Sequence, residues 1–321
     1  MTEPLTALRS TGLHWESGSP VLTATRPAHD LTSRLRPGLG RQGQPEHKRV
    51  LALGQRIDWT LRGARGCCGI WTGSHRIACP LNSALEDGTD PQCAACAAAD
   101  RGKALARDAI TDDGRTYGLY LAWFGPGLLK IGLTAAERGR DRLLEQGAIA
   151  YTMLAAGPYP GIRYAERLIS ASGLARERIP AHAKSTAWWA LPAAAGRSTE
   201  ITVTRARITG QMTWPASVEE TSGPVVDQAG DFGLDRAFPS SWDEVTAVTG
   251  GARPAGKVIA IVGRQILLDT SPGHLLIDMR RVAGWSFTSG AVPDARPAAT
   301  GLTTTTRTRP KELDDSQHTL F

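Results

Sequence analysis

The clearest pattern of apolar and polar positions lies in the middle of the chain, between residues 117 and 146. Two apolar runs of β-prone residues, 118–124 and 128–134, flank a loop at 125–127 that contains two glycines and a proline. Such runs around a short glycine-containing loop are typical of a β-hairpin. The sequence therefore predicts two antiparallel strands here.

After residue 134 the apolar positions take a helical spacing. Arg138, Arg142 and Gln146 stand four residues apart, which places two guanidinium groups and an amide on one helix face. Gly147 follows as a C-cap, and residues 148–155 can return as a third strand beside the hairpin. An arginine row is thus expected beside the end of the hairpin.

A second helix is predicted over residues 162–172. Ile162, Ala165 and Ile169 form its apolar face, which places Glu166 at the border of that face. A carboxylate at this border suits a metal site, and it equally suits a surface ion pair.

Function is not readable in residues 193–253, where the pattern weakens to one strand at 201–208 and a short segment around Trp242. Just before this stretch, Trp188 and Trp189 favour core packing. Stacking on nucleic-acid bases is the alternative for the pair.

Short strands are predicted at both ends of the chain, where they are expected to pack together as a small sheet or barrel. They cover residues 13–15, 21–25 and 50–61 on one side and 257–262, 265–269, 274–278 and 285–287 on the other. From residue 291 the chain is rich in Thr, Pro, Arg and Asp without periodicity, which predicts a disordered tail.

A chain of 321 residues is long enough for two or three compact units. We expect an α+β fold with an antiparallel sheet flanked by helices. The patterns indicate an N-terminal β-rich segment, a cysteine knuckle, a central unit, a C-terminal β-rich unit and the tail, at residues 1–66, 67–100, 117–192, 193–290 and 291–321.

All five cysteines fall between residues 67 and 96, which favours a metal site over a disulfide framework. A structural zinc site needs four such ligands in tetrahedral array. The favoured set is Cys68, Cys79, Cys93 and Cys96, in the spacing C-x10-C-x13-C-x2-C. Cys67 or His75 can replace Cys68 or Cys79 in this set.

The net charge of +6 and the sequence pI near 9.3 favour an anionic partner. No apolar run reaches the length of a membrane span, and the N-terminus lacks the apolar core of a signal peptide. We therefore expect a cytoplasmic protein without a membrane partner.

The hairpin and the helix after it resemble the core of the GIY-YIG nucleases. Residues 118–120 stand for the first triplet of that motif and residues 130–132 for the second, with nine residues between Tyr120 and Lys130. Arg142 stands for the helix arginine. The sequence departs from the motif where Lys130 replaces the second tyrosine, and where Gln146 stands in place of a common His or Tyr.

The resemblance implies a role for each matched residue. Tyr120 would position or help deprotonate the attacking water, while Arg142 with Arg138 would steady the scissile phosphate. Glu166 would hold one Mg²⁺ or Mn²⁺. Lys130 would either supply an extra cation or mark the loss of the tyrosine that activates water.

Two wider similarities accompany this core. The cysteine knuckle, residues 130–148, Glu166 and residues 256–269 are similar to the family of unknown function numbered 2797, across residues 11–287. At the C-terminus, Gln317, Leu320 and Phe321 resemble the sliding-clamp-binding peptide of bacterial replication and repair proteins.

These resemblances imply a metal-dependent DNA endonuclease that acts in repair or recombination. The alternative is a zinc-containing recruitment protein that binds nucleic acid and has lost nuclease activity. A third reading is an enzyme acting on a small phosphorylated substrate, because a row of arginines recognises any phosphate.

Overall fold

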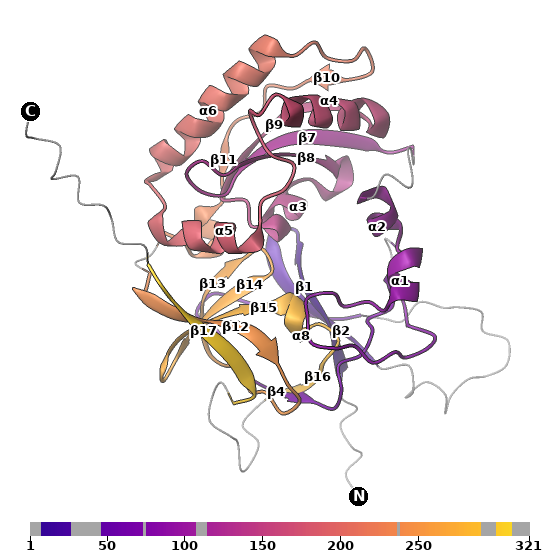
Figure 1. Cartoon of the computed structure of the whole chain (residues 1–321), viewed down its shortest axis with the longest axis vertical. Helices are drawn as coiled ribbons and strands as arrows, with labels where there is room; N and C mark the ends of the chain where they lie inside the picture. Colours follow the sequence, from indigo (N-terminus) through magenta and orange to yellow (C-terminus); the bar gives the residue numbers. More distant parts are fainter. Residues whose placement is uncertain are drawn as a thin grey trace, which may run out of the picture.

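The computed structural model describes residues 8–26, 46–72, 75–106, 114–235, 238–289 and 300–309. It is an α+β structure in which a small sheet with its helices and a large sheet form the two halves of the molecule (Figure 1). The cysteine-bearing segment, with helices α1 (Ala94–Ala99) and α2 (Arg101–Ala106), lies to one side of both. None of the helices in the described ranges is long and apolar enough to cross a membrane.

The large sheet has ten strands and joins the two ends of the chain. Its order is β17 (Leu302–Thr308), β12 (Ser241–Val248), β15 (Gly273–Asp278), β14 (Gln265–Thr270), β13 (Ala255–Val262), β4 (Arg56–Arg62), β16 (Ser286–Ser289), β1 (Leu8–Glu16), β2 (Ser19–Thr25) and β3 (His47–Val50). All neighbours in it are antiparallel except β12 and β15. The pairs β4–β13 and β1–β16 confirm that the terminal strands pack together.

The small sheet contains the predicted hairpin. Its order is β10 (Glu219–Glu220), β9 (Ala150–Pro158), β7 (Thr116–Trp123) and β8 (Leu129–Ala135), and β11 (Val226–Asp227) also pairs with β9. In the hairpin Tyr120 lies opposite Gly132. The hairpin, the third strand and the helix α4 (Tyr159–Ala171) are confirmed close to their predicted positions.

Alternate residues of β7 face opposite sides of the small sheet. Leu119, Leu121 and Trp123 belong to the main core, under α4 and α6 (Ala194–Gln211). Tyr120 faces the other way and shares a separate apolar cluster with Leu143 of α3 (Gly139–Gln146). Because both faces are covered, β7 is buried along nearly its whole length.

Helix α3 joins the small sheet to the large one. The Asp141 carboxylate accepts hydrogen bonds of 2.9 Å from the backbone N–H groups of Ser17 and Gly18. On the other side, a Cβ at Gly263 would lie 2.9 Å from the carbonyl oxygen of Glu145. The turn between β13 and β14 therefore presses against the end of α3, and only glycine fits at its φ of +61°.

The remaining short elements complete the packing. Trp188 and Trp189, in the 3₁₀ turn η3 (Trp188–Ala190), are buried, as expected for core residues. The Trp189 ring stacks on Trp242 of β12 at 3.6 Å between centroids. The other elements are β5 (Ile70–Trp71), β6 (Arg76–Ile77), η2 (Ala136–Arg138), α5 (Ala181–Ala187), α7 (Ala229–Phe232) and α8 (Met279–Val282).

Two predictions about secondary structure are wrong. Residues 201–208 form part of α6 and not a strand, because Ile201, Thr204 and Ile208 recur at helical spacing on its buried face. Part of the predicted disordered tail forms β17, whose backbone pairs with β12 along its length. The clamp-like residues Gln317, Leu320 and Phe321 lie outside the described residues.

Candidate functional site

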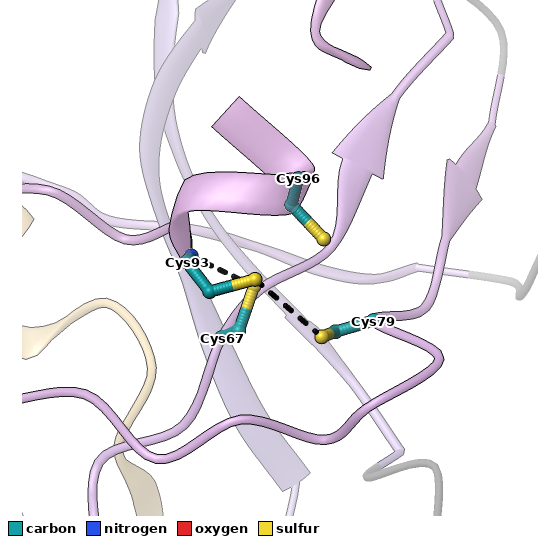
Figure 2. A group of neighbouring side chains, drawn as sticks. All are labelled: Cys67, Cys79, Cys93 and Cys96. Carbon is teal, nitrogen blue, oxygen red and sulfur yellow. Dashed lines mark hydrogen bonds between the residues drawn. The ribbon is translucent and has the colours of Figure 1, made fainter. Parts of the chain in front are cut away.

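Four cysteines meet in the segment beside the two sheets. The sulfur atoms of Cys67, Cys79, Cys93 and Cys96 all lie within 4.8 Å of one another (Figure 2). The Cys79 and Cys93 sulfurs are 3.9 Å apart. Four sulfurs bound at about 2.3 Å to a tetrahedral zinc ion are about 3.8 Å apart, so this cluster could hold a metal such as zinc.

The local backbone presents these sulfurs to one another. Cys67 Sγ accepts hydrogen bonds from the backbone N–H groups of Gly69 at 3.4 Å and Cys93 at 3.2 Å. A Cβ at Gly69 would lie 2.0 Å from the Ile77 carbonyl oxygen, so the knuckle requires glycine there. Cys93 precedes α1 and Cys96 lies in its first turn. The helix thus supplies both members of the Cys-x2-Cys pair.

The surroundings of the sulfurs favour thiolate at part of the cluster. Backbone hydrogen bonding with Cys96 lowers the pKa of Cys93 to about 6. Burial raises the pKa of Cys67 and of Cys96. A metal ion binds the thiolate form, so its binding would release the protons that the remaining thiols still carry.

The structure places Cys67 in the cluster where the sequence favoured Cys68. The two residues are adjacent, but their sulfur atoms have different neighbours. Cys68 Sγ lies 3.5 Å from the carbonyl oxygen of Ser10, and burial raises the pKa of its thiol to about 11. His75 is outside the four-residue group and hydrogen-bonds with Thr72.

A second cluster of polar groups surrounds Tyr120, on the face of the small sheet that α3 covers. Lys130 Nζ donates to the Tyr120 hydroxyl oxygen at 3.1 Å, and Gln146 Nε2 donates to the same oxygen at 2.7 Å. Tyr120 itself is only 1% exposed. At Gly132, an added Cβ would lie 2.3 Å from that oxygen and 2.4 Å from Lys130 Nζ. The glycine therefore leaves room for this pair.

Lys184 of α5 extends the same network. Its Nζ donates to the Gln146 carbonyl oxygen at 3.0 Å and lies 3.8 Å from the centre of the Phe124 ring. Burial, with the nearby charges of Lys130, Arg142 and Arg280, lowers the pKa of Lys184 to about 7. Cations from β8, α3 and α8 thus act electrostatically on Lys184 of α5.

The arginine row, with Arg138 at the end of η2 and Arg142 in α3, has a partner that the sequence did not reveal. Glu145, with a side chain 3% exposed, accepts from Arg138 at 2.8 Å and from Arg142 at 3.2 Å. Arg264 of the β13–β14 turn lies 3.4 Å away and His14 of β1 lies 3.3 Å away. The predicted phosphate-binding arginines are therefore paired with a buried carboxylate at the junction of the two halves.

Glu166 lies on the buried side of α4, as its predicted position at the edge of the apolar face allows. It forms a close ion pair with Arg163, whose Nη1 also lies 3.1 Å from the Glu177 carboxylate. Burial raises the pKa of Glu166, against the opposing effects of Arg163 and Lys130. Lys130 thus acts electrostatically on Glu166 while it donates to Tyr120.

One protein family matches this chain. The model of a family described as a protein of unknown function (DUF2797) matches residues 85–287, which is more than half of the chain. The chain belongs to the DUF2797 family. No curated protein and no solved structure matches it. The DUF2797 match includes the residues around Tyr120 and the Cys93–Cys96 pair, and it begins after Cys79.

Sequence reasoning on this DUF2797 chain missed several charged residues of the groups described above. Five charged residues take part in these electrostatic interactions, and none stands in a recognisable motif. They are Lys184, Glu145, Glu177, Arg264 and Arg280. Arg264 lies in the turn between β13 and β14 and Arg280 lies in α8, both more than 100 residues after the hairpin. Only the fold brings them to the small sheet, so no local signal could have found them.

Proposed function

We propose that the chain is a metal-dependent endonuclease of GIY-YIG-like type that acts on DNA in the cytoplasm, in repair or recombination. One observation carries this proposal. A hydrogen-bonded chain runs from Lys184 through Gln146 and Tyr120 to Lys130, which also acts on Glu166. This arrangement sets a tyrosine hydroxyl, two ammonium groups and a carboxylate around one region.

Each group has a role in phosphodiester hydrolysis. The cations Lys130 and Lys184 would neutralise phosphate oxygens, where negative charge builds up in the transition state. The Tyr120 oxygen already accepts two hydrogen bonds, so the hydroxyl can make a further hydrogen bond only by donating its own proton. That proton can be donated to a phosphate oxygen or exchanged with the attacking water.

Glu166 and Glu177 are the carboxylates that would hold a divalent cation of the magnesium type in this proposal. Mg²⁺ is commonly held by one or two carboxylates together with substrate phosphates, and Glu166 and Glu177 share Arg163 as a common partner. Bound there, Mg²⁺ or Mn²⁺ would supply Lewis-acid stabilisation of the phosphate. Arg163 holds the two carboxylates close to each other.

Cleavage of nicked, flap and branched DNA with Mg²⁺ or Mn²⁺ tests this proposal. We expect Glu166→Gln to reduce cutting by about 100-fold or more while DNA binding persists. The control is Glu220→Gln, which removes an exposed carboxylate from β10 of the same sheet and should leave cutting unchanged. Failure of the wild-type protein to cut any of these DNAs with either metal would refute the nuclease.

A non-catalytic recruitment protein is the second candidate. Tyr120 is 1% exposed, and Glu166 already forms an ion pair with Arg163. Both facts favour a nuclease-like core that only binds nucleic acid. This candidate predicts DNA binding that weakens with salt, without cleavage. Lys130→Met and Lys184→Met should each reduce the slope of log binding constant against log salt concentration by about 1.

We further propose that the C-terminus binds a sliding clamp through Gln317, Leu320 and Phe321. Two apolar anchors and an amide suit a groove on a ring already held on DNA. Deletion of residues 317–321 should abolish association with a purified bacterial clamp. Association that survives the deletion would remove this partner.

A further inference from the structure

A cavity of about 400 Å³ opens on the large sheet, away from Tyr120. Strands β3, β4 and β13 and the turn after β14 form its walls, and Ser289 at the end of β16 lies at its rim. Its volume falls within the range of small-molecule sites, about 300 to 1,000 Å³. The cavity is therefore large enough for a phosphorylated metabolite and too small for a duplex.

The charged side chains of this cavity are mostly positive. Arg253 donates to both oxygens of Asp58, at 2.8 and 2.6 Å, and this pairing lowers the pKa of Asp58. Arg49 and Arg56 also line the cavity, and neither side chain has a hydrogen-bond or ion-pair partner among the described residues. Asp58 is thus already neutralised, and two guanidinium groups remain available.

The uncharged polar groups in the cavity are mainly donors as well. Gln55 Oε1 accepts from the Ala52 backbone N–H at 3.1 Å, which leaves its amide N–H groups available. Ser271 and Ser289 each add a hydroxyl at the exposed rim. Guanidinium, amide N–H and hydroxyl donors without a competing free carboxylate match the acceptor oxygens of a phosphate.

We infer that this cavity binds the phosphate group of a small phosphorylated molecule, with Arg49 and Arg56 as its main contacts. Arg49 stands on β3 and Arg56 at the start of β4, so the two guanidinium groups approach the ligand from different strands. A bidentate contact from either would fix the orientation of the phosphate. The inference does not depend on nuclease activity.

Distance separates this cavity from Tyr120. Gly256 lines the cavity, while Gly263, seven residues further along the chain, contacts the end of α3. Seven strand residues span roughly 23 Å. A small ligand in the cavity therefore cannot reach Lys130 or Lys184, and the two cationic regions can be altered independently.

Calorimetric titration of the zinc-loaded full chain with inorganic pyrophosphate and with ADP, without added Mg²⁺, tests the inference. The double variant Arg49→Gln, Arg56→Gln should weaken binding at least about tenfold. The matched control is Lys48→Gln, Arg62→Gln, which removes the same charge from the same two strands. Lys48 pairs with Glu16, and neither control residue lines the cavity. This control should bind as the wild type does.

Two further measurements distinguish ligand binding in the cavity from DNA binding. Lys184→Met, which removes a cation beside Tyr120, should leave the Arg49- and Arg56-dependent binding of pyrophosphate intact even if all DNA binding is lost. A short oligonucleotide should bind the double variant as well as it binds the control. The inference is overturned if neither pyrophosphate nor ADP binds, if both double variants lose binding equally, or if only oligonucleotide binding falls.

Discussion

Glu145→Gln tests the junction between the two halves of the molecule most directly. The carboxylate is 3% exposed and faces Arg138, Arg142, Arg264 and His14 at 2.8 to 3.4 Å. Glutamine has nearly the same shape but carries no charge. The substitution therefore removes the electrostatic part of the junction and leaves the packing of α3 in place.

The exposure of the arginines that pair with Glu145 determines how much stability the substitution costs. Removing one member of a fully buried ion pair costs about 3 to 5 kcal/mol because the other charge stays in a dry site. Here the arginine side chains are 35 to 45% exposed and can turn to water. Each pair then counts for about 0.5 to 1 kcal/mol. We expect the free energy of unfolding to fall by about 2 to 3 kcal/mol, and Tm by roughly 4 to 10 °C.

The effect of Glu145→Gln should depend on pH with a definite sign. Burial favours the neutral acid, but His14 and the three arginines hold the pKa of Glu145 well below its ordinary value. A depressed pKa stabilises the fold fully above the unfolded value of about 4.3, and this stabilisation is lost as the pH falls through the folded value. The difference in stability between wild type and variant should therefore be largest near neutrality and shrink below pH 4.

Urea unfolding followed by tryptophan fluorescence, at pH 7 and at pH 3.5, measures both quantities. Glu137→Gln is the matched control, because this glutamate lies one turn before α3 and pairs with Arg115 at the surface, 56% exposed. It should cost less than about 1 kcal/mol. Equal stability of Glu145→Gln and wild type at pH 7, or a difference that persists unchanged in acid, would refute the reasoning.

The purified protein should contain about one zinc ion per chain by elemental analysis. Cys67→Ser should lose this zinc while Cys68→Ser keeps it, because only the Cys67 sulfur belongs to the four-cysteine cluster; the reverse result would restore Cys68 as the ligand. Gly132→Ala should lower DNA binding or cutting by about tenfold or more and should also lower stability by about 1 to 3 kcal/mol, since the new methyl group would overlap the buried Tyr120 ring as well as Lys130 Nζ. An active variant would show that the contact between Lys130 and Tyr120 is dispensable.

Local pattern was enough to predict the hairpin, α4 and most strands of the large sheet, because the strands are short apolar, β-prone runs and α4 has an apolar face at helical spacing. The same reasoning failed at residues 201–208, where β-branched residues favoured a strand. Arg197, Ile201, Thr204 and Ile208 are the buried positions of α6, and their spacing is helical. That prediction gave the β-branched composition of the segment more weight than the helical spacing of its apolar residues. The opposite error occurred in β17. Its threonine-rich run has high β propensity, but the segment was predicted to be part of a disordered tail.

Contacts between distant segments could not be predicted from the sequence. The choice between Cys67 and Cys68 depends on which of two adjacent side chains turns toward Cys79, and spacing cannot decide it. Nothing in the sequence around Glu145 marks it as a buried residue. Its burial arises only when the β13–β14 turn, more than 100 residues later, packs against the end of α3.

Helix α3 can both join the two halves and attract an anion, although Arg138 and Arg142 already pair with Glu145. Three arginines share this one carboxylate, which leaves an excess of two positive charges. Arg142 also lies close enough to Lys184 to lower its pKa. A phosphate near Tyr120 would meet that excess without breaking an ion pair. Glu145→Gln should therefore weaken folding and, at low salt, strengthen DNA binding, because it adds one uncompensated positive charge where the phosphate approaches.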